Sequence, residues 1–198
     1  MLRCRARYGL VLLVVAMAGV RAGAAECDAL DAIRDQWKRT RALLMPISEA
    51  IPEEKYDYKP TPEVRSFREM LLHMATDTHT HMGFVVGMSR EESEKLTEKY
   101  HGLKTRAELL GALGEAFDYG DKILADLNDQ NAMEMVTGHR DERMTRISAA
   151  LDVFTDIVDH YGNLVVYLRL NGIVPPSTAA RQAQRQQRQQ QQGEEHQP

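Results

Sequence analysis

The chain has 198 residues, of which 43% are hydrophobic, 27% charged and 6% aromatic. This composition fits one globular domain and excludes a collagen-like protein or a small domain held together by disulfides. Residues 1–25 contain four arginines and no acidic residue, so the rest of the chain carries 21 basic against 29 acidic side chains. An acidic surface of this kind lacks the positive charge that nucleic-acid phosphates attract, and we expect no nucleic-acid partner.

The first 25 residues have the three parts of a secretory signal peptide. Three arginines precede the apolar run 10–20, and small residues follow at 22–25. The run is about half of the roughly 20 residues that a membrane span needs, so an uncleaved anchor is the weaker alternative. We therefore expect export to the periplasm or the medium, with no membrane attachment after cleavage.

The two cysteines give no disulfide within the mature chain. Cys4 belongs to the predicted signal peptide, and Cys27 remains alone beside Glu26, where a lipoprotein signal has a small residue. The residues around Cys27 are mainly acidic, which does not favour a reactive thiolate. We expect an incidental thiol, with pairing between two chains as the alternative.

Helix signals dominate residues 26–178, and strand signals are nearly absent. Capping boxes at Ser66 and Thr105, each with glutamate three residues later, predict the starts of two helices. Gly172 predicts a left-handed helix end, and the two prolines after it should prevent a new helix. The expected helices cover residues 28–50, where Pro46 should bend or end the helix, 66–86, 105–124 and 143–170.

The remaining segments are predicted to be less regular. Residues 89–102 should be partly helical, and 128–142 should form a loop. Nine of the last 20 residues are glutamine, so we expect 179–198 to be a disordered tail. The domain 26–178 is then all-α, and four long helices predict an up-down four-helix bundle.

The expected fourth helix carries a polar stripe beside its apolar face. Asp156, His160, Asn163 and Tyr167 follow one another at spacings of four, three and four residues. Asp156 and His160 can therefore present an oxygen and a nitrogen to one cation. His73 on the second helix is the natural third ligand, and Asp77 and His81 follow it on the same face.

Spacing alone leaves a second interpretation open. A histidine on an apolar helix face is commonly a hydrogen-bonded core residue, and such a pair of Asp and His also occurs by chance. The other histidines have no comparable pattern, and we expect them at the surface: His79, His101, His139 and His196.

Three segments resemble proteins of the DinB-like family. DHYGNLVVYLRLNGIVPP at 159–176 resembles the end of the last helix of that bundle, and residues 51–75 resemble its first loop and second helix. KTRAELLGALGEAFDYGD at 104–121 is similar to the third helix. The resemblance extends over nearly all of 26–178.

This resemblance implies a four-helix bundle, often a homodimer, with a divalent metal held by three histidines. The family positions fall on His73, Asp156 and His160, so an aspartate replaces the first histidine of the C-terminal pair. A carboxylate can ligate zinc, nickel or manganese, so the site is either retained with another metal preference or lost.

The family includes metal-dependent thiol transferases and a mycothiol-dependent isomerase, so the resemblance implies a small thiol or an electrophile as a partner. Export argues against a cytoplasmic thiol cofactor, and a hydrolase that uses metal-bound water needs the same ligands. A non-catalytic protein that binds a metal or small ligand, or a structural dimer without a working site, is the alternative.

Overall fold

The computed structural model describes residues 29–195. The predicted signal peptide, Cys27 and His196 lie outside the described residues. The elements are α1 (Ala29–Glu49), η1 (Glu53–Lys55), α2 (Phe67–Val85), α3 (Arg90–Thr97), η2 (Glu98–Tyr100), α4 (Arg106–Asp126), β1 (Met135–Thr137), β2 (Arg143–Thr145), α5 (Arg146–Leu170) and α6 (Pro176–Glu195).

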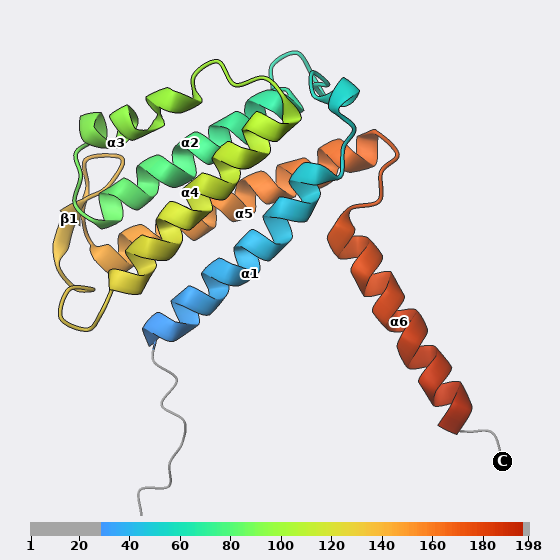
Figure 1. The fold of residues 1–198 in the computed structure, drawn as a ribbon. Coiled ribbons are helices and arrows are strands. Elements are labelled where there is room, and N and C mark those ends of the chain that lie inside the picture. The colour runs from blue at the N-terminus through green and yellow to red at the C-terminus, as the bar shows by residue number, and fades with distance from the viewer. Residues whose placement is uncertain (1–28, 196–198) are drawn as a thin grey trace, which may run out of the picture.

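Helices α1, α2, α4 and α5 pack into a four-helix bundle, which confirms the all-α fold class (Figure 1). Arg34 near the start of α1 donates to the carbonyls of Leu124 and Leu127 at the end of α4, so these two helices are antiparallel. Tyr167 near the end of α5 donates to the Arg65 carbonyl just before α2. The segment through α3 returns along the bundle, and α2 and α4 consequently run in the same direction instead of alternating as in a strict up-down bundle.

The helix ends follow the local signals of the sequence. The Ser66 hydroxyl accepts a hydrogen bond from the Glu69 N–H at 3.1 Å, and the Glu69 carboxylate accepts one from the Ser66 N–H at 2.6 Å. Thr105 and Glu108 form the same capping box at the start of α4. Gly172 has a φ of +72°, the left-handed conformation expected at the end of α5. Both predicted starts and the predicted end are confirmed.

A short β-hairpin replaces part of the expected loop. Val136 pairs with Met144 in an antiparallel register, and α5 consequently begins at Arg146 rather than at 143. Each strand has only three residues, which is too short for a periodic pattern in the sequence. The turn between the strands includes Asp141 at a φ of +63°.

Pro46 does not end its helix, and the expectations for Pro176 and for the tail need correction. Helix α1 continues through Pro46 to Glu49. Pro176 does not prevent a new helix but is the first residue of α6, where a missing N–H costs nothing. The tail at 179–192 is exposed but helical, and α6 extends away from the bundle (Figure 1). Alanine, glutamine and arginine are good helix formers, so low hydrophobicity here does not produce an irregular chain.

The bundle core is centred on Trp37, whose side chain is 1% exposed. Its ring centroid lies 4.8 Å from that of Phe117 on α4 and 5.7 Å from that of Phe154 on α5, so the indole joins three helices. Within residues 29–195, no helix combines the length and the apolar character needed to cross a bilayer.

Candidate metal site

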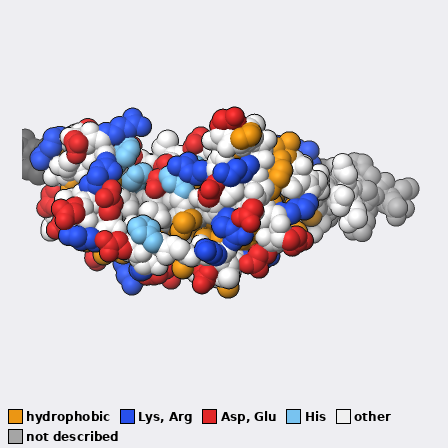
Figure 2. All heavy atoms as spheres, turned by 90° about the horizontal axis from the view of Figure 1, so that it is seen from above, with side chains coloured by type: hydrophobic (Ala, Val, Ile, Leu, Met, Phe, Trp, Pro, Cys, Tyr) orange, Lys and Arg blue, Asp and Glu red, His pale blue; other side chains and the backbone are white. Residues whose placement is uncertain are grey.

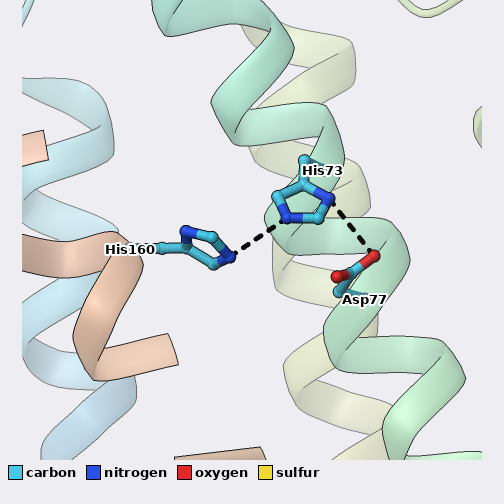
Figure 3. A group of neighbouring side chains, drawn as sticks. All are labelled: His73, Asp77 and His160. Carbon is cyan, nitrogen blue, oxygen red and sulfur yellow. Dashed lines mark hydrogen bonds and ion pairs between the residues drawn. The ribbon is translucent and has the colours of Figure 1, made fainter. Parts of the chain in front are cut away.

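Helices α2 and α5 bring His73 and His160 together (Figure 3). Their Nε2 atoms are 3.1 Å apart, and the ring planes cross at 75°. His160 is 9% exposed, and the capping box at Ser66 fixes where α2 begins and hence which face His73 occupies. The structure thus places two of the three predicted ligands in direct contact.

Asp77 lies on the other side of the His73 ring. Asp77 follows His73 by one helical turn, and the Oδ1 of Asp77 lies 3.3 Å from the Nδ1 of His73 (Figure 3). One ligand atom from each of His73, Asp77 and His160 can be chosen so that all three lie within 4.8 Å of one another. Asp77 is therefore part of this cluster, although the sequence alone made it one of several extra candidates.

Asp156, the third predicted ligand, approaches His160 instead of His73. Its Oδ1 is 3.5 Å from the Nε2 of His160, the same nitrogen that faces His73. Asp156 and His73 thus converge on one atom of His160, whereas Asp77 approaches the nitrogen of His73 that points away from His160. The two carboxylates occupy different positions relative to the imidazole pair.

The half-buried Asp156 and the buried His160 shift each other's pKa. The hydrogen bond to Asp156 raises the pKa of His160, and burial opposes this effect. Burial acts to raise the pKa of Asp156, but the hydrogen bond and charge of His160, helped by His81 and His73, outweigh burial and lower it. The lowered pKa of Asp156 and the raised pKa of His160 both favour an ionised carboxylate beside a positive charge. A protonated imidazole or a metal cation can provide that charge.

The spacing of the two histidines fits a shared ion. Two nitrogens at about 2.05 Å from one zinc ion are roughly 3.3 Å apart in tetrahedral geometry and roughly 2.9 Å apart at a right angle. The observed 3.1 Å between the Nε2 atoms lies between these values. Imidazole and carboxylate are also the donors that zinc, nickel and manganese accept, so the residues fit a divalent transition metal.

Two cavities flank this cluster. One, of about 400 Å³, is lined by Asp77 and Asp156 together with His81 and His139. The other, of about 680 Å³, is lined by His160 together with Asn163 and Tyr167. The first cavity therefore reaches the two carboxylates of the cluster, and the second reaches the His160 imidazole.

The remaining histidines differ from the surface assignment in two cases. His79 is 4% exposed, so its surface assignment is wrong: its Nδ1 is 3.0 Å from the Tyr100 hydroxyl and its ring stacks on Tyr119. His139 is half-buried, and its ring centroid is 5.0 Å from that of His81. His101 is exposed as expected.

Sequence reasoning missed His139 as a cavity residue. The hairpin turn carries it over the end of α2, and Arg90 holds the turn by donating to the His139 carbonyl. This contact joins positions 49 apart in the chain, and no local pattern in the sequence indicates it.

The family model of the DinB superfamily matches residues 36–164. This protein belongs to the DinB superfamily. No curated protein matches the chain. Among solved structures, it is similar to a DinB-like protein from Bacillus subtilis, with 20% identity, a TM-score of 0.57, and coverage of 71% of this chain and 92% of the other.

Two further structures share the fold of this DinB-superfamily member. A DinB-like protein from Bacillus cereus has 11% identity and a TM-score of 0.63, covering 74% of this chain and 95% of the other. A mycothiol-dependent maleylpyruvate isomerase has 8% identity and a TM-score of 0.58. That alignment covers 68% of this chain and only 60% of the isomerase, so part of the isomerase has no counterpart here.

Proposed function

We propose that this DinB-superfamily protein binds one divalent transition metal between α2 and α5 and uses it to activate a thiol or a water molecule. The observation that carries the proposal is the 3.1 Å approach of the Nε2 atoms of His73 and His160, with a carboxylate beside each ring. His73, His160 and Asp156 are the proposed ligands. Zinc, nickel and manganese are the candidate ions.

The four side chains would have distinct roles. His73 and His160 would each use Nε2 toward the ion. Asp77, at 3.3 Å from Nδ1 of His73, would accept the proton on that nitrogen and fix the ring, as outer carboxylates do for metal-bound histidines. Asp156 would supply an anionic oxygen in place of the third histidine of the family.

A bound divalent ion would lower the pKa of a coordinated thiol or water and so supply a nucleophile near neutral pH. The chain's own contribution is to hold the ligands in a half-buried cleft and to keep open the adjoining 400 Å³ cavity for a second reactant. Thiol transfer to an electrophile and hydrolysis both fit this arrangement. The mycothiol-dependent isomerase among the structural neighbours favours thiol chemistry as the first to test.

Metal binding can be measured directly on the purified protein by elemental analysis and by thermal unfolding with added zinc, nickel or manganese. At a free metal concentration of 100 times Kd, binding should stabilise the fold by about 2.7 kcal/mol, which corresponds to roughly 5–10 °C in Tm. His160→Ala and the milder His160→Gln should lose both the metal and the Tm gain. His101→Ala removes an exposed histidine outside the site and should retain them.

A folded protein that contains no metal, and whose Tm ignores all three ions, would refute the site. The result would then favour the non-catalytic alternative, a structural bundle with a hydrogen-bonded imidazole pair. One bound metal without turnover of any thiol or ester would favour a metal-binding protein over an enzyme.

Export and dimerisation complete the proposal. Mass spectrometry of the mature protein should find an N-terminus near Ala25 or Glu26, and an intact Met1 in the cytoplasmic fraction would contradict export. Sedimentation at micromolar concentration should show a homodimer. A monomer would remove that part of the proposal.

A further inference from the structure

The 400 Å³ cavity that Asp77 and Asp156 help to line has a marked excess of negative charge. Five carboxylates line it, from Asp77, Glu142, Asp152, Asp156 and Asp159. Among the described residues that line it, Arg140 is the only one with a guanidinium or an ammonium group. Even with both lining histidines protonated, the carboxylates would outnumber the positive groups.

The two helices that line the cavity, α2 and α5, also lack basic residues over most of their length. Helix α2 and the turn after it contain no lysine or arginine between Arg68 and Arg90. Helix α5 contains none between Arg146 and Arg169. In a chain with 25 basic residues, these helices therefore bring no counter-charge of their own to the cavity.

Two of the carboxylates are exposed and have no salt-bridge partner among the described residues. Asp152 and Asp159 lie one turn before and one turn after Asp156 on α5, so the three acids share one face. Within residues 29–195, neither Asp152 nor Asp159 forms a salt bridge, whereas Asp77 and Asp156 approach the histidines. Like charges at this spacing repel each other, and a cationic ligand would relieve the repulsion.

Imidazole rings make up another part of the cavity wall. His81 and His139 lie side by side, with ring centroids 5.0 Å apart. Phe84 lines a small recess of about 20 Å³ that both histidines also line. The cavity itself, at about 400 Å³, falls in the range of small-molecule sites. Figure 2 shows histidines reaching one face of the molecule among acidic and basic side chains.

We propose that this cavity selects small ligands that carry a protonated amine and rejects those that carry a carboxylate. Its electrostatic potential attracts a cation and repels an anion before any specific contact forms. The inference rests on the proposed function for the reaction, because the amine-bearing molecule would be the thiol or electrophile that meets the metal. The selectivity itself depends only on the cavity.

Three small thiols of similar size test the effect of ligand charge. Cysteamine carries an ammonium group, 2-mercaptoethanol a hydroxyl and mercaptoacetate a carboxylate. The metal-free protein, with Cys27→Ser to prevent mixed disulfides, would be titrated with each thiol, and the imidazole signals of His81 and His139 followed by NMR. Cysteamine should move both signals. Mercaptoacetate should require a concentration higher by roughly five- to tenfold.

A matched pair of variants tests the origin of this preference. Asp152→Asn with Asp159→Asn removes two charges inside the cavity, and Glu54→Gln with Glu98→Gln removes two exposed charges outside its lining. The first pair should bring the cysteamine and mercaptoacetate affinities within about twofold of each other. The second pair should keep the original difference, which also controls for the net charge of the protein.

The same titrations on cobalt-loaded protein, followed by the thiolate-to-cobalt absorption band, separate the two proposals. Failure to bind cobalt would count against the metal site, while the metal-free titrations would still decide the charge preference. Equal affinities for cysteamine and mercaptoacetate, or a preference that survives Asp152→Asn with Asp159→Asn, would overturn the inference.

Discussion

His73 and His160 stand 87 positions apart in the chain, yet their Nε2 atoms lie 3.1 Å apart across the interface of α2 and α5. Two neutral imidazoles at this distance need either an N–H of one ring that donates to the other nitrogen or a shared ion, because two lone pairs facing each other repel. The carboxylates are arranged unevenly around the pair, with Asp156 beside the shared face and Asp77 behind His73. This asymmetry leads to different predictions for the two acids.

Asp156→His should strengthen binding of zinc and nickel. The change restores the three-histidine pattern that the family resemblance implies, and imidazole is the better ligand for these ions. Competition titration with a metal indicator would measure the affinity. Asp129→His places the same residue on the exposed surface, outside the lining of both cavities, and should leave the affinity nearly unchanged. Weaker zinc binding by Asp156→His would indicate that Asp156 is not a ligand.

Asp77→Asn should weaken metal binding by about 10- to 100-fold without abolishing it, because Asp77 is predicted to orient His73 from behind. Asn retains an oxygen that can accept the Nδ1 proton but loses the negative charge. Asp156→Asn, in contrast, replaces a ligand and should cost more affinity. If Asp77→Asn removes all binding while Asp156→Asn does not, the ligand set is His73, Asp77 and His160.

The parts of the fold that sequence predicted are those set by local chemistry. Ser66 and Thr105 each satisfy N–H groups within one turn, and Gly172 adopts a conformation that other residues avoid. Such signals depend only on neighbours in the chain. The proximity of Asp156 and His160 could be predicted for the same reason, because the two residues are four positions apart on one helix.

The parts that sequence did not predict depend on distant contacts or on balanced propensities. His139 reaches the cavity because Arg90 holds the hairpin turn, and His79 is buried because Tyr100 and Tyr119 pack around it. The tail at 179–192 has too few apolar residues to bury, which indicated disorder, yet its alanines and glutamines favour helix over coil. The composition of this segment thus predicts correctly that it is exposed, but it does not predict its secondary structure.

Stability should fall as the pH is lowered from about 6.5 to 4 because of His79. Burial lowers the pKa of His79 to about 4, so in this range the unfolded chain binds the proton more readily than the folded one. The loss should approach roughly 2–3 kcal/mol and level off below about pH 4. Urea unfolding at several pH values measures it. In His79→Asn this contribution should disappear, and an unchanged pH slope in that variant would contradict the assignment.

Deleting residues 179–198 should leave the Tm nearly unchanged. The residues at 179–192 are exposed, and the hydrogen bond between Tyr161 and Ser177 at 2.6 Å, which ties the start of α6 to α5, is retained. An isolated exposed helix adds little stability to the bundle. Circular dichroism should show less helix with the same midpoint. A loss of several degrees would mean that α6 packs on a partner chain.

Gly120→Ala should destabilise the bundle by about 1–3 kcal/mol, because a Cβ at this position of α4 would lie 2.2 Å from Cζ2 of Trp37. The indole is 1% exposed and packs on rings from two helices, so it has little freedom to move away. Gly114→Ala on the same helix is the matched control, since no atom of the described residues lies within 4 Å of its added Cβ. There the higher helix propensity of alanine should instead stabilise by up to about 1 kcal/mol. Chemical denaturation measures the change in the free energy of unfolding for each variant. Changes of opposite sign would show that close packing on Trp37, and not helix propensity, determines the requirement for glycine at 120. Equal stabilisation by both variants would show that the indole does not lie against Gly120.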